Sequence, residues 1–332
     1  MKRGFLPPVP IEFFGPDDLD TINLWKTFFI ASDEERRNWV ELGKRNIDEL
    51  PFFYLALIGM VNEKEIGEFW YPENCFGKFL RKVVDILKKE GKSVIAFKYP
   101  PIRNIDFFKK VISQSLDFLG ISESEMETRL QAWNSLRNVV KRLDCVQVQT
   151  RGKVIGSYSY VEALHSVLDP TQSLPKISRT AETIVAIKST NSNREPFLKV
   201  GIVEMSPFQQ SFYSTIEKFN GIVVYDELGI ENFPLDNFSD LSYLYSQVTF
   251  PLGIKTRKDK IAKAIQLRGI DVLIYGTFDF TEIKSNADYL QRELKIPLFI
   301  YKIPENEQKE KIENSLLEIF LKNVLDQRNI KK

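Results

Sequence analysis

The chain has 332 residues and a mass of 38.6 kDa, which corresponds to about two domains of roughly 150 residues each. Hydrophobic residues make up 43% and charged residues 27%, so the composition excludes a disordered or fibrous protein. The 46 Lys and Arg residues nearly cancel the 45 Asp and Glu residues. Because this balance removes the positive field on which non-specific nucleic-acid binding depends, we expect no nucleic-acid partner.

No apolar run approaches the roughly 18 to 20 residues of a membrane-spanning helix, the longest being residues 52–61. The first ten residues, MKRGFLPPVP, place prolines where a signal peptide has its apolar segment. We therefore expect a cytoplasmic protein without membrane contact. Its two cysteines and one histidine cannot supply the four Cys or His ligands of a structural zinc site.

The first third of the chain begins with a proline-rich and then helical stretch, residues 1–50, which predicts a lead-in of loop and helix. Short apolar runs follow at residues 52–59, 66–71 and 93–99, a pattern typical of buried parallel strands. Between the last two runs, apolar residues at helical spacing predict a helix that ends at Gly91. This succession indicates a first α/β domain.

Residues 105 to about 168 show helical periodicity with almost no strand signal. Ser122 and Glu125 have the spacing of a capping box at the head of a long helix. Residues 170–193 are rich in Ser, Thr and Pro and predict a linker or surface loop, apart from a short strand at 183–187. We therefore expect a helical insert.

Strand and helix signals alternate again in the last third of the chain. The strands are predicted at KVGIVEM, IVVYDE, DVLIYGTF and IPLFIYKI, and the helices at residues 208–219, 258–268, 286–294 and 305–325. Such alternation predicts a mostly parallel, doubly wound sheet. The predicted fold class is thus α/β, with two Rossmann-like doubly wound domains and a helical insert between them. The expected boundaries are 1–104, 105–195 and 196–332.

Ligands of open parallel sheets bind outside the carboxyl ends of the strands, so the loops at those ends are the candidate sites. In the last third of the chain these loops contain Ser206, Pro207, Glu227 and Asp279. Asp226 and Glu227 form an acidic pair, for which catalysis and simple solvation of a strand end are both open.

Asn74 and Cys75 follow the strand at residues 66–71 and come just before a helix. The helix dipole favours a thiolate at such a position, which suits a metal ligand or a reactive thiol. The alternative is a small buried residue that packs the turn. Cys145 follows a long helix and is expected to be a core thiol, and His165 a packed or surface histidine. No glycine-rich phosphate loop follows any predicted strand.

The chain resembles the 2-hydroxyacyl-CoA dehydratase and benzoyl-CoA reductase family over most of its length. Four segments carry the resemblance: ENCFGKFLRKVVDILKKEGKSVIAFKYPPIRN, LQAWNSLRNVVKRL, VGIVEMSPFQQSFYSTIEKFNGIVVYDELG, and the stretch from Thr249-Phe250-Pro251 through DVLIYGTFDF to IPLFIYKI. No single segment is specific, and the evidence is that several weak matches occur in the same order.

The resemblance implies a subunit of two Rossmann-like domains that holds a four-iron four-sulfur cluster with three cysteines. In that family two subunits form a heterodimer, a separate ATP-hydrolysing activator supplies an electron, and an acyl-CoA is reduced to a ketyl radical before it loses water. Cys75 matches one cluster cysteine, and Asp279 stands where the second-domain cysteine is expected. The earliest cysteine, expected within residues 52–59, has no counterpart.

Three hypotheses follow. The first is a cluster-deficient subunit of such a complex that supports a homologous cluster-bearing partner in a heterodimer, or forms a homodimer, and shapes the acyl-CoA site. The second is an iron–sulfur enzyme subunit in which Cys75 and Asp279 act with further ligands from elsewhere. The third is a non-enzymatic binding or assembly protein on the same fold. The residues expected to line the site are Asn74, Cys75, Ser206, Pro207, Glu227 and Asp279.

Overall fold

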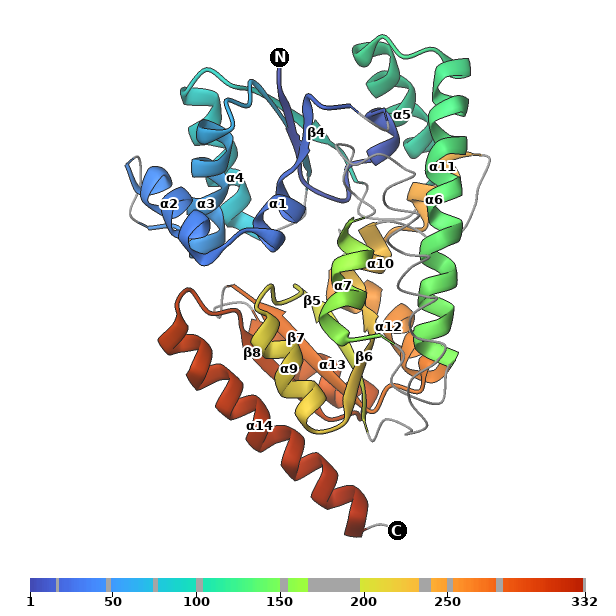
Figure 1. The fold of residues 1–332 in the computed structure, drawn as a ribbon. Helices are drawn as coiled ribbons and strands as arrows, with labels where there is room; N and C mark the ends of the chain where they lie inside the picture. Colours follow the sequence, from blue (N-terminus) through green and yellow to red (C-terminus); the bar gives the residue numbers. More distant parts are fainter. Residues whose placement is uncertain are drawn as a thin grey trace. The chain divides into compact units, whose positions relative to one another are not determined.

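The computed structural model describes residues 1–15, 18–45, 49–73, 77–99, 104–149, 155–166, 198–232, 240–249, 253–278 and 283–330. The chain divides into two compact units, each assembled from separate stretches of sequence. The first unit contains Met1–Lys141, His165–Thr180 and Glu231–Leu252, and the second contains Arg142–Leu164, Ala181–Ile230 and Gly253–Lys332. Each unit holds one four-stranded parallel sheet flanked by helices, so the chain consists of two Rossmann-like α/β domains, as predicted (Figure 1).

The sheet of the first unit has the order β2-β1-β3-β4. Its strands are β1 (Arg3–Phe5), β2 (Thr21–Asn23), β3 (Glu68–Pro72) and β4 (Ser93–Phe97), and all pairs are parallel. The prediction that residues 1–50 contain only loop and helix is wrong, because β1 and β2 lie there and β1 is a central strand. Strands of three residues are too short to show an alternating pattern.

The prediction of a strand at residues 52–59 is also wrong, because these residues begin the helix α3 (Phe52–Glu63). A helix that is apolar on all sides is read as a strand when its sequence is judged by runs of hydrophobic residues alone. The helix α2 (Asp33–Lys44) packs against it so closely that added Cβ atoms at Gly43 and Gly59 would lie 2.1 and 1.9 Å from backbone oxygens of the facing helix. The glycines therefore permit this helix crossing.

The helical predictions for the middle of the chain are confirmed. The helix α4 (Gly77–Lys89) is followed by Gly91 in the left-handed region, with φ of 79°, which ends the helix before β4. The predicted long helix is α6 (Glu123–Gln149), and the Ser122 hydroxyl accepts a hydrogen bond from the Glu125 N–H at its start. Up to Ser166 the chain also forms η1 (Ile11–Phe13), α1 (Leu24–Ile30), α5 (Ile105–Leu119) and α7 (Ser157–Ser166), and α11 (Leu241–Ser246) belongs to the first unit.

The sheet of the second unit has the order β6-β5-β7-β8, with all pairs parallel. The four predicted strands are confirmed as β5 (Leu198–Glu204), β6 (Gly221–Asp226), β7 (Val272–Thr277) and β8 (Leu298–Lys302). The helices are α9 (Gln210–Lys218), α10 (Glu227–Asn232), α12 (Ile254–Arg268), α13 (Ile283–Leu294) and α14 (Glu307–Ile330). The strand predicted at residues 183–187 lies outside the described residues.

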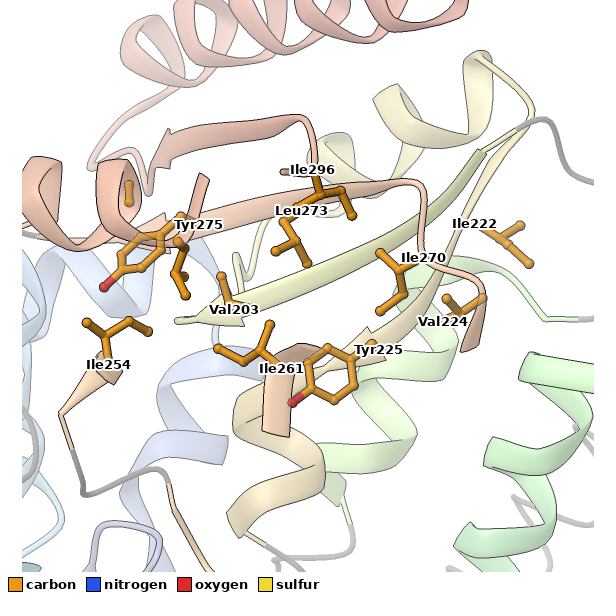
Figure 2. Close-up of a cluster of buried hydrophobic side chains, with 12 residues drawn as sticks. Val203, Ile222, Val224, Tyr225, Ile254, Ile261, Ile270, Leu273, Tyr275 and Ile296 are labelled. Atoms are coloured by element: carbon orange, nitrogen blue, oxygen red, sulfur yellow. The ribbon is translucent and has the colours of Figure 1, made fainter. Parts of the chain in front are cut away.

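Helices cover both faces of this second sheet. On one face, Ile261 of α12 packs with Leu273 of β7 and with Val203 and Tyr225 in a buried cluster (Figure 2). On the other face, α9 and α14 pack against β8 through the ring pairs Phe212–Tyr301 and Phe299–Phe320. No helix within the described ranges has the length and apolar character to cross a bilayer.

Candidate functional site at the carboxyl edge of the second sheet

The carboxyl ends of β5 and β7 form the point at which the connections of the second sheet diverge. From β5 the chain passes to β6 on one side, and β7 lies on the other side, which is the arrangement that opens ligand sites in parallel sheets. The two strand ends lie in close contact, because the Met205 N–H donates to the Gly276 carbonyl at 3.2 Å. A Cβ at Gly276 would lie 1.8 Å from the Met205 oxygen, so this approach requires glycine.

A charged cluster occupies this edge and is centred on Arg257 of α12. The Arg257 Nη2 lies 2.5 Å from the Glu204 Oε2, and its Nε lies 3.2 Å from the Glu227 Oε1. Glu227 also accepts the Glu204 backbone N–H at 2.9 Å, and the Tyr275 hydroxyl donates to Glu204 at 3.3 Å. Arg257, Glu227 and Tyr275 are buried, whereas the Glu204 side chain is 31% exposed.

Glu204 is also the residue whose backbone departs from an ordinary conformation. Its φ of 68° places it in the left-handed region, which is uncommon for a residue with a side chain. Such backbone conformations occur often at functional sites, where the surrounding structure holds them in place. The hydrogen bond from its own N–H to Glu227 supplies that restraint here.

The charges of this cluster reinforce one another. Burial alone would lower the pKa of Arg257, but the neighbouring charges of Glu204 and Glu227 outweigh it and raise the pKa above its ordinary value. Burial, followed by the charge of Glu204, raises the pKa of Tyr275, so its hydroxyl stays protonated as a donor. Two carboxylates against one guanidinium leave an excess of negative charge, and the partly exposed Glu204 carboxylate is suited to accept a hydrogen bond from a ligand.

A second polar pair lies on the next loop along the same edge. The Ser206 hydroxyl donates to the Asp226 Oδ1 at 2.5 Å, and both residues are fully buried. Burial, followed by the charge of Asp226, raises the pKa of the nearby Tyr213. The Tyr213 hydroxyl donates to the Pro207 carbonyl at 2.6 Å, which fixes the loop that follows β5.

The residues predicted from sequence are thus partly brought together. Ser206, Pro207 and Glu227 lie at the carboxyl edge of one sheet, as expected from their strand-end positions, and all three are buried. That they line a substrate site stays a prediction. Asn74, Cys75 and Asp279 lie outside the described residues.

Sequence reasoning missed Glu204, Arg257 and Tyr275. Glu204 belongs to a predicted strand, but its left-handed backbone has no sequence signal. Arg257 is one of several cations in a stretch of basic residues, and only the fold distinguishes it as buried. Tyr275 lies within the apolar run of strand β7, where the sequence alone does not mark it as a polar contact.

The first unit has a buried charged cluster of its own. Arg137 of α6 pairs with Glu12, and the Tyr245 hydroxyl donates to the other Glu12 oxygen at 2.8 Å. Arg137 also donates to the Asn134 amide oxygen at 2.8 Å. Because all three members of the cluster are fully buried, it ties η1, α6 and α11 together and offers no surface to a ligand.

A hollow of about 620 Å³ lies at the opposite, amino edge of the second sheet. It is bounded by the end of α13, the start of β8 and the last part of α14, with Lys295, Leu298, Phe320 and Asn323 among its lining residues. It therefore lies away from the Arg257 cluster.

The donor set of the chain does not fit a four-iron four-sulfur cluster, which is held by thiolates. The whole chain has two cysteines, and the prediction that Cys145 is a core thiol is wrong, because it lies within α6 and is exposed. The other cysteine, Cys75, lies outside the described residues. Across the described ranges, no three His, Cys, Asp or Glu side chains are grouped to hold a metal ion.

Comparison with known proteins gives no match, either to a protein-family model or to a curated protein.

Proposed function

We propose that the chain is a subunit of a 2-hydroxyacyl-CoA dehydratase or benzoyl-CoA reductase-type complex that has no cluster of its own and supports a homologous, cluster-bearing partner. The proposal rests on one combination of observations. The chain contains two parallel sheets of identical strand order, but it has two cysteines in total. The scaffold of a cluster-binding subunit would thus persist without the sulfur donors. An ATP-dependent activator would then act on the partner.

In this function the carboxyl edge of the second sheet receives the acyl part of the acyl-CoA. The accessible Glu204 carboxylate accepts a hydrogen bond from the 2-hydroxy group, while Arg257 and Tyr275 hold that carboxylate in place. A buried cluster with an excess of negative charge repels phosphates, so the CoA phosphates bind elsewhere.

A thermal-shift comparison tests the ligand. At 100 times its dissociation constant a ligand stabilises the folded chain by about 2.7 kcal/mol, or roughly 5 to 10 °C for a domain of this size. We expect 2-hydroxypropionyl-CoA, whose acyl part is uncharged, to stabilise the chain more than propionyl-CoA, and Glu204→Gln to reduce the difference. The matched control is Glu305→Gln, which removes an exposed glutamate of a surface ion pair. Equal shifts for both thioesters in the wild type would contradict this assignment.

Affinity purification from the native cells tests the partner. The tagged chain should retain a homologue that contains at least three more cysteines, together with iron that belongs to that homologue. A monodisperse chain that retains no homologue would refute the subunit role.

A further inference from the structure

Helix α14 carries a second apolar row that does not face its own sheet. Leu317, Leu321 and Val324 are buried against the second unit, which accounts for one side of the helix. Ile312, Leu316 and Ile319 are 53%, 46% and 58% exposed. Their spacing of four and three residues places them on one face of the helix. We call this exposed face the α14 row.

The α14 row continues into the open edge of the sheet. Phe320, next to Ile319, contacts Phe299 of β8, with ring centroids 5.2 Å apart. Among the described strands β8 is the last of its sheet, and its first three residues are apolar and half-buried. Figure 1 shows α14 lying along this part of the unit. An edge strand that is apolar up to Lys302 at its end, beside an exposed apolar row, is the kind of surface through which proteins associate.

The α14 row extends in both directions along the helix at the same spacing, and a residue of opposite charge stands at each end. Positions three and four residues apart along this face are Lys309, Ile312, Leu316, Ile319, Asn323 and Asp326. This is the spacing of a two-helix seam. Lys309 and Asp326 are 17 residues apart, or about 25 Å along the helix axis. The row is therefore an apolar centre with Lys309, whose ammonium also pairs with Glu305 at 2.7 Å, at one end and Asp326 at the other.

We propose that the α14 row is a homodimer interface, in which α14 packs against α14 of a second copy of this chain in antiparallel orientation. A two-fold axis midway between Leu316 and Ile319 places each of these residues opposite the other in the second copy. The same axis places Lys309 opposite Asp326, and it does so at both ends. A parallel pair would set Lys309 against Lys309 and Asp326 against Asp326, which repel.

The central pair and the two charged ends are thus complementary in one orientation, with Ile312 opposite Asn323 between them, and a two-fold interface requires such self-complementarity. The polar faces of α14 beside the row carry both Lys311 and Glu318, so the helix lacks the cationic face of one that lies on an anionic membrane. The inference uses no residue of the Arg257 cluster and is independent of the proposed function.

Sedimentation velocity on the purified full chain tests the interface. Over a concentration series the wild type should reach twice the 38.6 kDa of one chain. Leu316→Glu should remain monomeric over the same series. The matched control is Leu267→Glu, which changes an equally apolar residue of α12 that is 69% exposed and lies off the row. Far-UV circular dichroism checks that both variants fold. A wild type that is monomeric throughout, or equal effects of the two variants, would overturn the proposal.

A charge exchange tests the orientation. Lys309→Glu and Asp326→Lys should each raise the dissociation constant of the dimer by about tenfold, because each variant turns two attractive contacts into repulsive ones. The double variant should restore the wild-type value, since it exchanges the charges and keeps the pairing. Two single variants whose effects add in the double variant would exclude the antiparallel arrangement.

Discussion

Removal of the Arg257 guanidinium is expected to destabilise the second unit, because it leaves two carboxylates without their shared cation. Arg257→Ala loses the contacts of 2.5 Å to Glu204 and 3.2 Å to Glu227. Loss of one partner of a buried ion pair costs about 3 to 5 kcal/mol. Because Glu204 is partly exposed and can be rehydrated, we expect the lower end of that range, about 3 kcal/mol.

Urea unfolding monitored by far-UV circular dichroism measures this loss. All four tryptophans, Trp25, Trp39, Trp70 and Trp133, lie in the first unit, so their fluorescence reports on that unit separately. Arg257→Lys is the matched control, because it keeps the charge and loses the forked geometry, and it should cost less than Arg257→Ala. A loss below about 1 kcal/mol for Arg257→Ala would refute the account of the cluster.

A double-mutant cycle separates the charge from the packing. Arg257→Met leaves the Glu227 carboxylate buried without its cation, whereas the added change Glu227→Gln removes that uncompensated charge. The double variant should therefore be more stable than Arg257→Met alone, by roughly 1 to 3 kcal/mol. A double variant that is less stable than Arg257→Met would mean that the two residues do not act as a pair.

Three further variants test other contacts by urea unfolding. Ser32→Ala should lower the free energy of unfolding by about 1 kcal/mol at pH 7. Hydrogen bonds from Ser32 hold the pKa of Glu35 below its ordinary 4.5, so the difference in stability from wild type should shrink as the pH falls below that value. A difference that stays constant with pH would contradict the capping box. Gly59→Ala should lower the free energy of unfolding of the first unit by about 3 kcal/mol, because its Cβ would overlap the backbone of α2. Tryptophan fluorescence follows this unfolding, and an unchanged urea midpoint would disprove the close crossing. Tyr275→Phe should cost about 1 kcal/mol through the lost hydrogen bond to Glu204, and a neutral result would mean that Glu204 does not need this donor.

The second sheet could be predicted from the sequence because β5, β6 and β7 are almost entirely buried on both faces and β8 begins with an apolar, half-buried run. Such strands appear as apolar runs of five to seven residues, and β5 to β8 have these lengths. The first sheet could not be predicted in full. Its strands β1 and β2 have three residues each, β2 pairs with β1, and β1 pairs with β3 far along the chain, which no local pattern reveals.

The candidate site was predictable to the extent that it follows from strand ends. That rule pointed to Ser206 and Glu227, because Glu227 comes directly after β6 and Ser206 lies two residues beyond the end of β5. It could not identify Arg257, because this residue lies in the helix α12 and does not follow a strand. Its burial between two carboxylates is a property of the tertiary structure alone.

Iron analysis of the chain, purified and reconstituted with iron and sulfide in the absence of oxygen, tests the central claim most directly. We predict colourless protein with no stoichiometric iron, and no change when Cys75 is replaced by serine. Brown protein with four irons per chain that are lost in Cys75→Ser would show that the chain holds its own cluster and would contradict the account.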